Sequence, residues 1–342
     1  MKVDVITVTD LCQNILHAHG VGPASARIQI DLLVEAQLRG YASHGLLRLR
    51  RIVERIEAGV TAPNATGLHT WHGPAQLIVD GERGLGPVVA INALSIVQQR
   101  ARDSGIAMAA IHNSNHIGML AWYGEQVAAD GLMLIAATTS EALVHPWGGR
   151  RAMVGTNPLC IAVPAQPEPL VLDMATSLVS MGKIHDYANR GAKLPEGWAL
   201  DVDGNPTTDA VAAKAGSLAP FGGAKGYALG LALEVLVTSL AGSAIGANVA
   251  GTLDSERVCN KGDLFIVIAP QQGSGVAELV STYLNEVRQS DPGEPGSPVT
   301  VPGDRARRTR ARGNAEGLEL EEELWRDLLA LGRSAEQVRT SA

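Results

Sequence analysis

Four side chains in this sequence are suited to proton transfer or to binding a small anion. They are His44, Arg48, His116 and Asp173, and each stands among glycines or small polar residues. A histidine exchanges a proton near neutral pH. An arginine can hold a carboxylate through two parallel hydrogen bonds, and a buried carboxylate is costly unless it has a partner or a task. Together these residues predict a proton-transfer site that binds a carboxylate.

Each of these residues also has an ordinary structural interpretation. His44 would be a surface or capping histidine, and Asp173 would lie in a turn before a helix that Thr176 or Ser177 caps. Capping and ligand binding are compatible at that strand end, so both interpretations stay open. Arg48 would be one exposed arginine in a run that also contains Arg50, Arg51 and Arg55.

Metal binding and nucleophilic catalysis have less support in the sequence. His112 and His116 are four residues apart, but they stand in a loop after a predicted strand, and no HExxH motif or cysteine cluster supplies further ligands. There is also no GxSxG motif, and no cysteine stands beside a plausible base. We therefore expect no metal site and no covalent nucleophile.

The elements that must position these side chains alternate between helices and short apolar runs typical of buried strands. Thr9 or Asp10 is expected to cap the first helix and Ser43 the third. Strands are expected at 76–80, 105–111, 132–137, 159–163, 170–172 and 264–269. Helices are expected at about 9–20, 23–38 and 46–56, then up to 97, up to 129, and at 226–241, 275–288 and 319–331.

Two stretches are expected to lack regular structure. Residues 191–209 are rich in Gly, Pro and Asp. Residues 291–314 shift to Pro, Gly and Arg and are expected to form a long loop or a linker. The arginines of this second stretch predict either a solvated, mobile basic segment or one or two contacts with a cofactor phosphate. They are Arg305, Arg307, Arg308, Arg310 and Arg312.

A strand, a glycine-rich loop and a helix follow one another at 76–97, an order similar to a dinucleotide-binding fingerprint. The glycines, however, are Gly81, Gly84 and Gly86, which gives GxxGxG instead of GxGxxG, and no suitably placed acid follows. We therefore do not expect a Rossmann fingerprint here. Lys225 stands at the start of a predicted helix, where the helix dipole disfavours a cation, so a bound anion or exposure to solvent would explain it, and the anion is the preferred interpretation.

Composition sets further limits. The 342 residues suffice for about two domains, and the net charge of −7 argues against a general nucleic-acid-binding surface. The three cysteines are far apart and form no CxxC pair, which suits a reducing cytosol. The most apolar predicted helix, 226–241, contains Glu234 and is short for a membrane span. We expect a cytoplasmic enzyme.

A series of short motifs, in this order, resembles the malate/L-lactate dehydrogenase family of the non-Rossmann type, from about Leu11 to Leu331. The family includes enzymes acting on ureidoglycolate, sulfolactate, 2,3-diketogulonate and Δ1-piperideine-2-carboxylate. The motifs are Ser43-His44-Gly45 with Arg48, Asn115-His116 with Gly118, Pro146-Trp147-Gly148-Gly149, Gly155-Thr156-Asn157-Pro158, Asp173-Met174-Ala175-Thr176-Ser177, Gly182-Lys183, Leu194-Pro195-Glu196-Gly197-Trp198-Ala199 and Lys225-Gly226.

This resemblance implies an α/β fold, with a mixed sheet, flanking helices and a helical domain built from both ends of the chain. We expect residues 1–75 with 300–342 to form the helical domain. Residues 76–299 would form the central domain that binds cofactor and substrate. The resemblance also implies a homodimer with the site near the subunit interface, and NAD or NADP bound without a GxGxxG loop.

The resemblance assigns roles to individual residues as well. His44 and His116 match the two histidines assigned as proton donor or acceptor, Arg48 matches the arginine that holds the substrate carboxylate, and Asp173 matches an acid at the catalytic centre. Further substrate contacts are implied at Ser43, Thr156 and Asn157. Cofactor contacts are implied at Ser140, Pro146, Trp147, Gly148, Asp173, Met174, Ala175, Thr176, Lys225, Gly303 and Asp304. Asp304 departs from the family pattern, because a glutamate is common there.

The sequence thus predicts an oxidoreductase that moves a hydride between a nicotinamide and C2 of a 2-hydroxy acid or 2-keto acid. His116 ranks before His44 as the proton donor, and Asp173 would orient or charge that histidine. NAD is expected, with NADP as the alternative, because no arginine stands out as a 2′-phosphate clamp. Two alternatives remain, reduction of a cyclic imine by the same residues and a non-catalytic protein that binds small anions.

Overall fold

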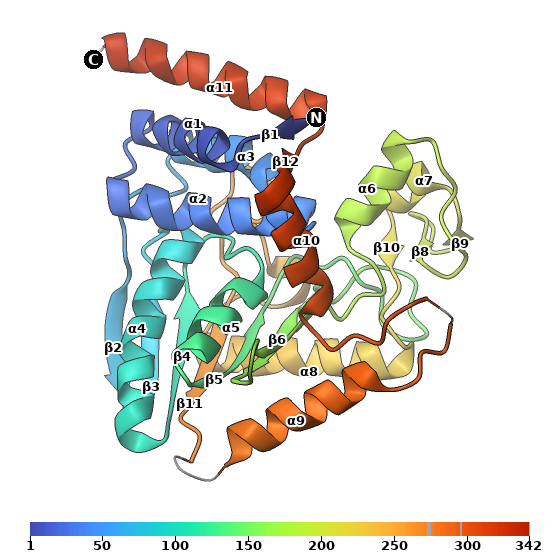
Figure 1. Ribbon diagram of the computed structural model, residues 1–342. Helices are drawn as coiled ribbons and strands as arrows, with labels where there is room; N and C mark the ends of the chain where they lie inside the picture. Colours follow the sequence, from blue (N-terminus) through green and yellow to red (C-terminus); the bar gives the residue numbers. More distant parts are fainter. Residues whose placement is uncertain (272–274, 295, 342) are drawn as a thin grey trace.

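The chain folds into helices and strands that alternate along most of its length (Figure 1). This computed structural model describes residues 1–271, 275–294 and 296–341. The strands are β1 (Lys2–Val3), β2 (Leu68–His72), β3 (Gln76–Asp80), β4 (Ile106–His112), β5 (Met133–Thr138), β6 (Leu159–Val163), β7 (Leu170–Met174), β8 (Ala199–Leu200), β9 (Pro206–Thr207), β10 (Ser217–Leu218), β11 (Asp263–Ile268) and β12 (Leu318–Glu319). The α-helices are α1 (Val5–Ala18), α2 (Pro23–Leu38), α3 (Leu49–Glu57), α4 (Gly86–Ser104), α5 (Leu120–Ala129), α6 (Met181–Asn189), α7 (Ala210–Lys214), α8 (Ala224–Ala241), α9 (Val276–Gln289), α10 (Asp304–Glu316) and α11 (Glu322–Ser341). The 3-10 helices are η1 (Ala42–His44), η2 (Leu46–Arg48) and η3 (Gly246–Asn248).

A mixed sheet of seven strands lies at the centre, in the order β2-β3-β4-β11-β5-β6-β7. Strands β3 and β4 are parallel, and the other neighbours are antiparallel. Asp80 pairs with His112, Asp263 pairs with Thr138, and the first residue of β6 pairs with the last residue of β7. The loops after β3, β4, β5 and β7, and those before β6 and β11, therefore leave the sheet at the same end.

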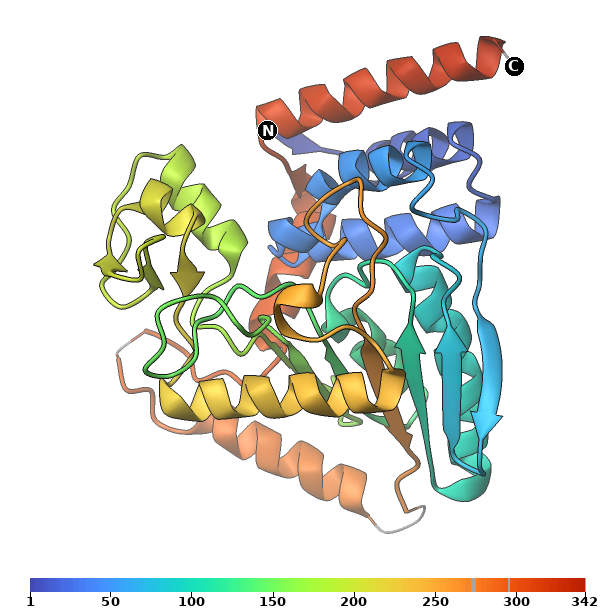
Figure 2. The same ribbon diagram turned by 180° about the vertical axis from the view of Figure 1, so that it is seen from behind.

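Helices cover both faces of this sheet because the strands are apolar on both sides. Helices α4 and α5 pack on one face, and α8 packs on the other through Leu233 and Val237 (Figure 2). Helix α2 lies across α4 and α5, and α1 and α11 lie beyond α2 (Figure 1).

Helix α8 is long and apolar enough to cross a membrane by length and composition alone. A packed helix of a soluble protein passes the same test.

A small lobe stands apart from the sheet at the side of the molecule (Figures 1 and 2). It consists of α6, α7 and the three-stranded sheet β10-β8-β9. Its own apolar cluster includes Ile184, Leu194 and Leu218. This lobe contains most of residues 191–209. These residues are less irregular than their composition suggests, because they include the short strands β8 and β9 and the residue that caps α7, Asp209.

The six strands and most of the helices expected from the sequence are confirmed, while several helix ends are not. Helix α1 begins before Thr9 because the side chain of Asp4 caps it, accepting a hydrogen bond from Thr7 N at 2.9 Å. Ser43 caps no helix, because the chain at 42–48 forms two 3-10 turns before α3 begins. The helix expected after Thr176 begins only at α6, and Ser180 is its cap.

The arginine-rich stretch differs most from the expectation. Its second half forms the helix α10, which the Pro and Gly content of the whole stretch concealed. Arg307 and Arg310 are ion-paired with acids on other helices, so the segment is not a solvated loop. The last helix is also longer than expected, because α11 continues past Gly332 to the end of the described chain.

Candidate active site

Two histidines face each other at the end of the sheet where the loops gather. The ring centroids of His44 and His116 are 5.4 Å apart, and the ring planes are inclined by 32°. His44 ends η1 in the N-terminal helical layer, and His116 lies in the loop between β4 and α5. Two segments distant in sequence thus bring together the two residues expected to exchange the proton.

The glycine-rich loop before α4 supports the His116 loop. A side chain on Gly86 would collide with the carbonyl oxygens of Asn115 and His116. A side chain on Gly81 would approach Ser114 Cβ to 2.7 Å and Asn113 O to 2.9 Å. The GxxGxG pattern is therefore explained by close backbone packing beneath the His116 loop, a use of glycine that needs no nucleotide.

Asn115 fixes the same loop from within. Its side-chain amide donates to the carbonyl oxygens of Arg83 and Gly84, both at 2.8 Å. Its Oδ1 accepts from Arg55 Nε at 3.0 Å and from Thr61 Oγ1 at 3.1 Å. All the polar atoms of this buried side chain are thus satisfied, which holds the neighbouring His116 in place.

The hydrogen bonds of the two rings differ. Nδ1 of His116 accepts from Gly118 N at 3.1 Å, so a neutral His116 carries its proton on Nε2. Nδ1 of His44 lies 3.0 Å from the Ser43 hydroxyl, which can donate or accept. His44 can therefore take either tautomer, whereas His116 is set as a hydrogen-bond donor through Nε2.

Burial and nearby cations keep both rings uncharged. Burial, followed by the charge of Arg48, lowers the pKa of His44 to about 4. Burial, with Arg48 and His44 as the next causes, lowers the pKa of His116 well below its usual value. Both histidines are therefore neutral at physiological pH in the free protein.

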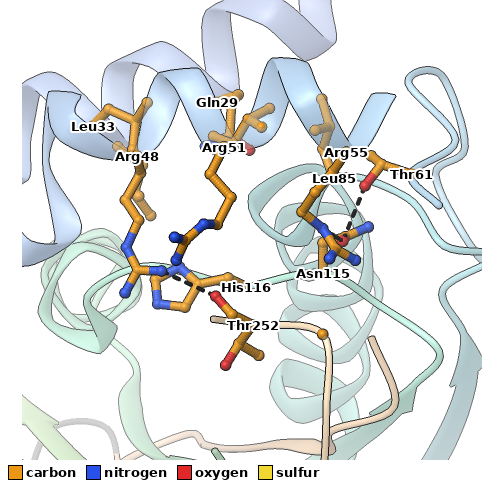
Figure 3. A pocket seen from close by; sticks show the side chains of 13 residues that line it. Gln29, Leu33, Arg48, Arg51, Arg55, Thr61, Leu85, Asn115, His116 and Thr252 are labelled. Atoms are coloured by element: carbon orange, nitrogen blue, oxygen red, sulfur yellow. Dashed lines mark hydrogen bonds between the residues drawn. The ribbon is translucent and has the colours of Figure 1, made fainter. Parts of the chain in front are cut away.

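Arg48 lies beside the histidines. Its Nε donates to Ser43 O at 2.8 Å and its Nη1 donates to Thr252 O at 3.1 Å, as Figure 3 shows for the second bond. Burial and Arg51 lower the pKa of Arg48 to about 10, so the guanidinium stays charged near neutral pH. Two backbone carbonyls thus orient the fork, and donor hydrogens at its outer end remain for an anion.

Glu141 is a residue of the site that the sequence reasoning missed. This buried carboxylate accepts hydrogen bonds from Thr252 N at 2.8 Å and Leu253 N at 3.0 Å, and another from the Thr252 hydroxyl. Because Thr252 O in turn accepts from Arg48, Glu141 fixes the loop that orients Arg48. An acid directly after the polar residues at the end of β5 was the signal available in the sequence.

Asp173 lies at the same end of the sheet but not with the histidines. It is near the end of β7, and its Oδ2 accepts from Ala121 N, in the first turn of α5, at 2.8 Å. Burial raises the pKa of Asp173 to about 6, although backbone N–H groups at the start of α5 and Arg39 oppose that rise. Asp173 lines a cavity of about 400 Å³ with Tyr41 and Gly303. Neither His44 nor His116 is among the described residues that line this cavity.

The residues expected to contact cofactor or substrate at 140, 156, 157 and 176 do lie together. Ser140 Oγ accepts from Thr156 N at 2.9 Å, and Thr176 Oγ1 donates to Thr156 O at 3.0 Å. Asn157 donates through Nδ2 to Glu234 Oε2 at 2.7 Å. The antiparallel register of β5, β6 and β7 produces this cluster, since it brings the three loops to one place.

Glu234 is a second residue whose importance the sequence reasoning missed. It is buried within the otherwise apolar α8 and also accepts from Gly155 N at 3.0 Å and from Gly246 N at 2.6 Å. It thereby ties the 155–157 loop to α8 and η3. A single acid within an apolar helix was the signal, because such a group needs partners when it is buried.

The other expected cofactor residues form two separate surfaces. The Trp147 ring lies against Gly223, directly before α8, where Lys225 is exposed on the first turn. At the second surface, Gly303 precedes the first residue of α10 as its N-cap, with a φ of 99°. Burial would raise the pKa of Asp304, but hydrogen bonds from Arg288, Val301 N and Arg307 lower it to about 2. The carboxylate of Asp304 is thus already paired with cations of its own chain.

No group of three or more His, Cys, Asp or Glu side chains that could hold a metal occurs in the described part of the chain. His112 ends β4, and His116 lies in the loop that follows it. Of the two, only His116 lines the cavity next to Arg48, Arg51 and Arg55.

Comparison with known proteins gives matches along nearly the whole chain. Residues 3–329 match the family described as malate/L-lactate dehydrogenase. A dehydrogenase structure from Sinorhizobium meliloti superposes with a TM-score of 0.94 at 49% identity, covering 97% of this chain and 98% of that one. The sulfolactate dehydrogenase structure from Methanocaldococcus jannaschii superposes with a TM-score of 0.92 at 33% identity, covering 98% of each chain. The malate/(S)-sulfolactate dehydrogenase of Methanothermus fervidus is 35% identical over 313 residues, 91% of each chain.

Proposed function

The chain belongs to the malate/L-lactate dehydrogenase family and is a hydroxy acid dehydrogenase, and from this premise we propose its reaction and the residues that perform it. The reaction is hydride transfer between NAD and C2 of a 2-hydroxy acid, with the 2-keto acid as the other product or substrate. The observation that supports this best is the pair of neutral histidines beside Arg48, with ring centroids 5.4 Å apart.

Arg48 binds and orients the substrate carboxylate through the outer end of its guanidinium group. The C2 oxygen then lies between the two imidazoles, where His116 donates a hydrogen bond from Nε2 and His44 exchanges the proton. Because Nδ1 of His116 is occupied by Gly118 N, its neutral ring polarises the oxygen more readily than it accepts a proton. His44, linked to the Ser43 hydroxyl, is the better acceptor, which would reverse the order expected from the sequence.

The residues present suit a nicotinamide cofactor, as the family implies. The cavity of about 400 Å³ beside Asp173 and Gly303 is within the size range of small-molecule sites, and Asp173 is a buried carboxyl group whose pKa is raised. When bound, the cofactor supplies or accepts the hydride at C2. The chain would hold it at Ser140, at Pro146, Trp147 and Gly148, at Asp173, Met174, Ala175 and Thr176, and at Lys225, Gly303 and Asp304.

NAD remains the proposed form of the cofactor. Arg305 lines the same cavity, and no hydrogen bond or ion pair of its side chain occurs within the described residues, so it is the cation to test for a 2′-phosphate contact. A strong preference of the purified enzyme for NADPH over NADH would overturn the choice of NAD. Loss of that preference in Arg305→Ala would then identify the phosphate contact.

We further propose a cytoplasmic homodimer with the site near its interface. Helices α8 and α9 both lie in the lower part of the molecule as drawn, with α9 nearer the viewer in Figure 1 and α8 nearer in Figure 2. They expose large apolar side chains, which a second copy could cover. These are Leu231, Val235, Leu236, Leu279 and Tyr283. Within each subunit, residues 1–75 with 300–342 would form the helical domain and 76–299 the domain that holds the cofactor.

The direct test is a substrate scan with purified protein. A panel of 2-keto acids and cyclic imines is mixed with NADH or NADPH, and the loss of reduced cofactor is followed by absorbance. We expect turnover of 2-keto acids with NADH. Turnover of cyclic imines alone would assign the same residues to C=N reduction. Binding of small carboxylates without any turnover would indicate an anion-binding protein and overturn the proposal.

A further inference from the structure

Three arginines form a row on the inner side of the α3 segment. Arg48, Arg51 and Arg55 are spaced three and four residues apart, so they share one helix face, and all three line one cavity with His116 (Figure 3). Arg50 points the other way, is exposed, and pairs with Asp327 at 3.3 Å. The structure thus divides the arginine run into one surface residue and three that face the site.

The three inward arginines differ in what they already bind. Nε and Nη1 of Arg48 donate to backbone carbonyls, and Arg55 donates to Asn115 Oδ1 and to the carbonyls of Asp254 and Arg257. Within the residues that the structure describes, Arg51 makes no recorded hydrogen bond or ion pair, and its Nε is buried without a partner. Arg48 and Arg55 each keep one terminal nitrogen, Nη2, without a recorded partner, and that of Arg55 is buried. Arg51 is therefore the member of the row whose whole guanidinium group has no partner among the described residues.

The charges around this cavity do not balance. The nearby acids are Glu141, whose carboxylate is held by Thr252, and Asp254, which pairs with Arg257 at 2.8 Å. No acidic side chain lines the cavity itself, whereas three guanidinium groups do. A partly buried cation without a partner is costly, so this arrangement is best explained by an anion that arrives with the substrate.

The size and position of the cavity suit one end of a small molecule. Its volume is about 30 Å³, which is room for roughly two water molecules and thus comparable to the oxygens of one carboxylate. Figure 3 shows Arg48 and Arg51 side by side, both directed toward His116. A substrate whose C1 carboxylate binds Arg48 and whose C2 oxygen meets the histidines can reach Arg51 with a group two or three atoms further on.

We propose that Arg51 binds a second anionic group of the substrate, so that this enzyme selects dianionic 2-hydroxy acids bearing a distal carboxylate or sulfonate over monoanionic ones. This inference rests on the proposed hydride transfer at the same site and assigns its substrate class. Arg55 adds positive charge behind Arg51, but its Nε and Nη1 are held by Asn115 and by two backbone carbonyls, so we assign the specificity to Arg51, whose guanidinium group makes no such bonds.

The test compares matched substrates and matched variants. Oxaloacetate and 2-ketobutyrate differ only in that a methyl group replaces the distal carboxylate, and 3-sulfopyruvate carries a sulfonate there. The kcat/KM of the native enzyme should favour the dianions over 2-ketobutyrate. In Arg51→Gln, kcat/KM for the dianions should fall roughly 10–100-fold, as expected for one lost charge-assisted hydrogen bond, while that for 2-ketobutyrate changes little. Comparing oxaloacetate with 3-sulfopyruvate shows which oxyanion is preferred.

Arg50→Gln is the control, because it removes the same charge from the outer side of the helix and should leave all three values unchanged. A second measurement needs no variant: succinate should inhibit the native enzyme more strongly than butyrate, which lacks one carboxylate. Equal losses for oxaloacetate and 2-ketobutyrate in Arg51→Gln, or equal inhibition by succinate and butyrate, would overturn the role of Arg51 and leave hydride transfer standing. Failure to reduce any 2-keto acid would instead overturn the proposed function, and this inference with it.

Discussion

At the scale of single residues, the site depends on histidines that are held neutral and an arginine that is held charged in the same enclosed place. Desolvation disfavours the charged form of each group, but its effect is very different for a group that titrates near neutral pH and one that titrates far above it. Burial therefore lowers the pKa of His44 to about 4, yet it leaves Arg48 cationic with a pKa of about 10. The result is a proton acceptor next to an anion-binding cation.

The two histidines should prove separable by substitution. We expect His44→Ala and His116→Ala each to lower kcat by about 10²–10⁴-fold, with cofactor affinity retained in both. His116→Gln should recover part of the loss, because an amide N–H can still donate to the C2 oxygen, whereas His44→Gln should not, because it cannot exchange the proton. Steady-state kinetics with cofactor titration measures this. If His44→Gln recovered activity and His116→Gln did not, His44 would be the hydrogen-bond donor and His116 the residue that exchanges the proton.

The low histidine pKa values also predict the pH dependence of oxidation. The acceptor must be neutral in the free enzyme, so kcat/KM for the hydroxy acid should stay constant from neutral pH downward. It should fall only as the pH approaches about 4, where His44 becomes protonated. An exposed histidine would give the same fall near its unperturbed value of about 6.5. A pH series of kcat/KM decides this, and an acidic limb near 6.5 would show that His44 is not the acceptor.

At the scale of elements, a helix or strand could be predicted where the residues that determine it are neighbours in the sequence. Strand β6 and helix α2 were predicted with correct ends, because apolar runs and the turn residues around them are local signals. The roles of Gly86 and Glu141 could not be predicted, because their partners at 115–116 and 252–253 are distant in sequence and come together only through strand pairing. The family resemblance named His44 and His116 as a pair, but only the fold brings them together.

The glycine loop gives a prediction at this scale. Gly86→Ala changes the first residue of α4, where the preference of a helix interior for alanine should matter little. It should nevertheless lower kcat, because the new methyl group meets the carbonyl oxygens of Asn115 and His116. A displacement of about 1 Å at a catalytic group can cost roughly 10²-fold in rate.

The control for Gly86→Ala is Gly293→Ala, because a methyl group there would have no neighbouring atom within 4 Å. Activity and urea unfolding are measured for both variants. We expect a low kcat with a folded protein for the first variant and native behaviour for the second. Native kcat in Gly86→Ala would show that the glycine loop does not position His116.

At the scale of the whole molecule, a chain of ion pairs connects helices that are far apart in sequence. Glu125 on α5 accepts from Arg39, directly after α2, at 2.6 Å and from Arg310 of α10 at 3.1 Å. Asp304, at the start of α10, continues the chain by pairing with Arg307 and with Arg288 of α9. The unexpected helix α10 is thereby docked against the core, which places Gly303 and Arg305 in the lining of the large cavity.

This network leads to the last prediction, which concerns Glu125. The Arg39 side chain is only 2% exposed and pairs with Glu125 and Glu35. Without the Glu125 carboxylate, both Arg39 and Arg310 would keep Glu35 as their acidic partner among the described residues. Loss of one member of a buried ion pair costs about 3–5 kcal/mol, so Glu125→Gln should unfold at clearly lower urea concentration. It should also raise the KM for the cofactor, because α10 and the Gly303 loop lose their anchor.

Asp186→Asn is the matched control, because it breaks an ion pair with Arg190 in which both side chains are about half exposed, and such pairs contribute under about 1 kcal/mol. Urea denaturation of the native protein and both variants, followed by circular dichroism, measures the stabilities, and initial rates give the KM. If Glu125→Gln unfolds no earlier than Asp186→Asn, the arginines of α10 are not held by the buried acid. In that case the Gly303 loop must be positioned by the pairing of Asp304 with Arg288 and Arg307.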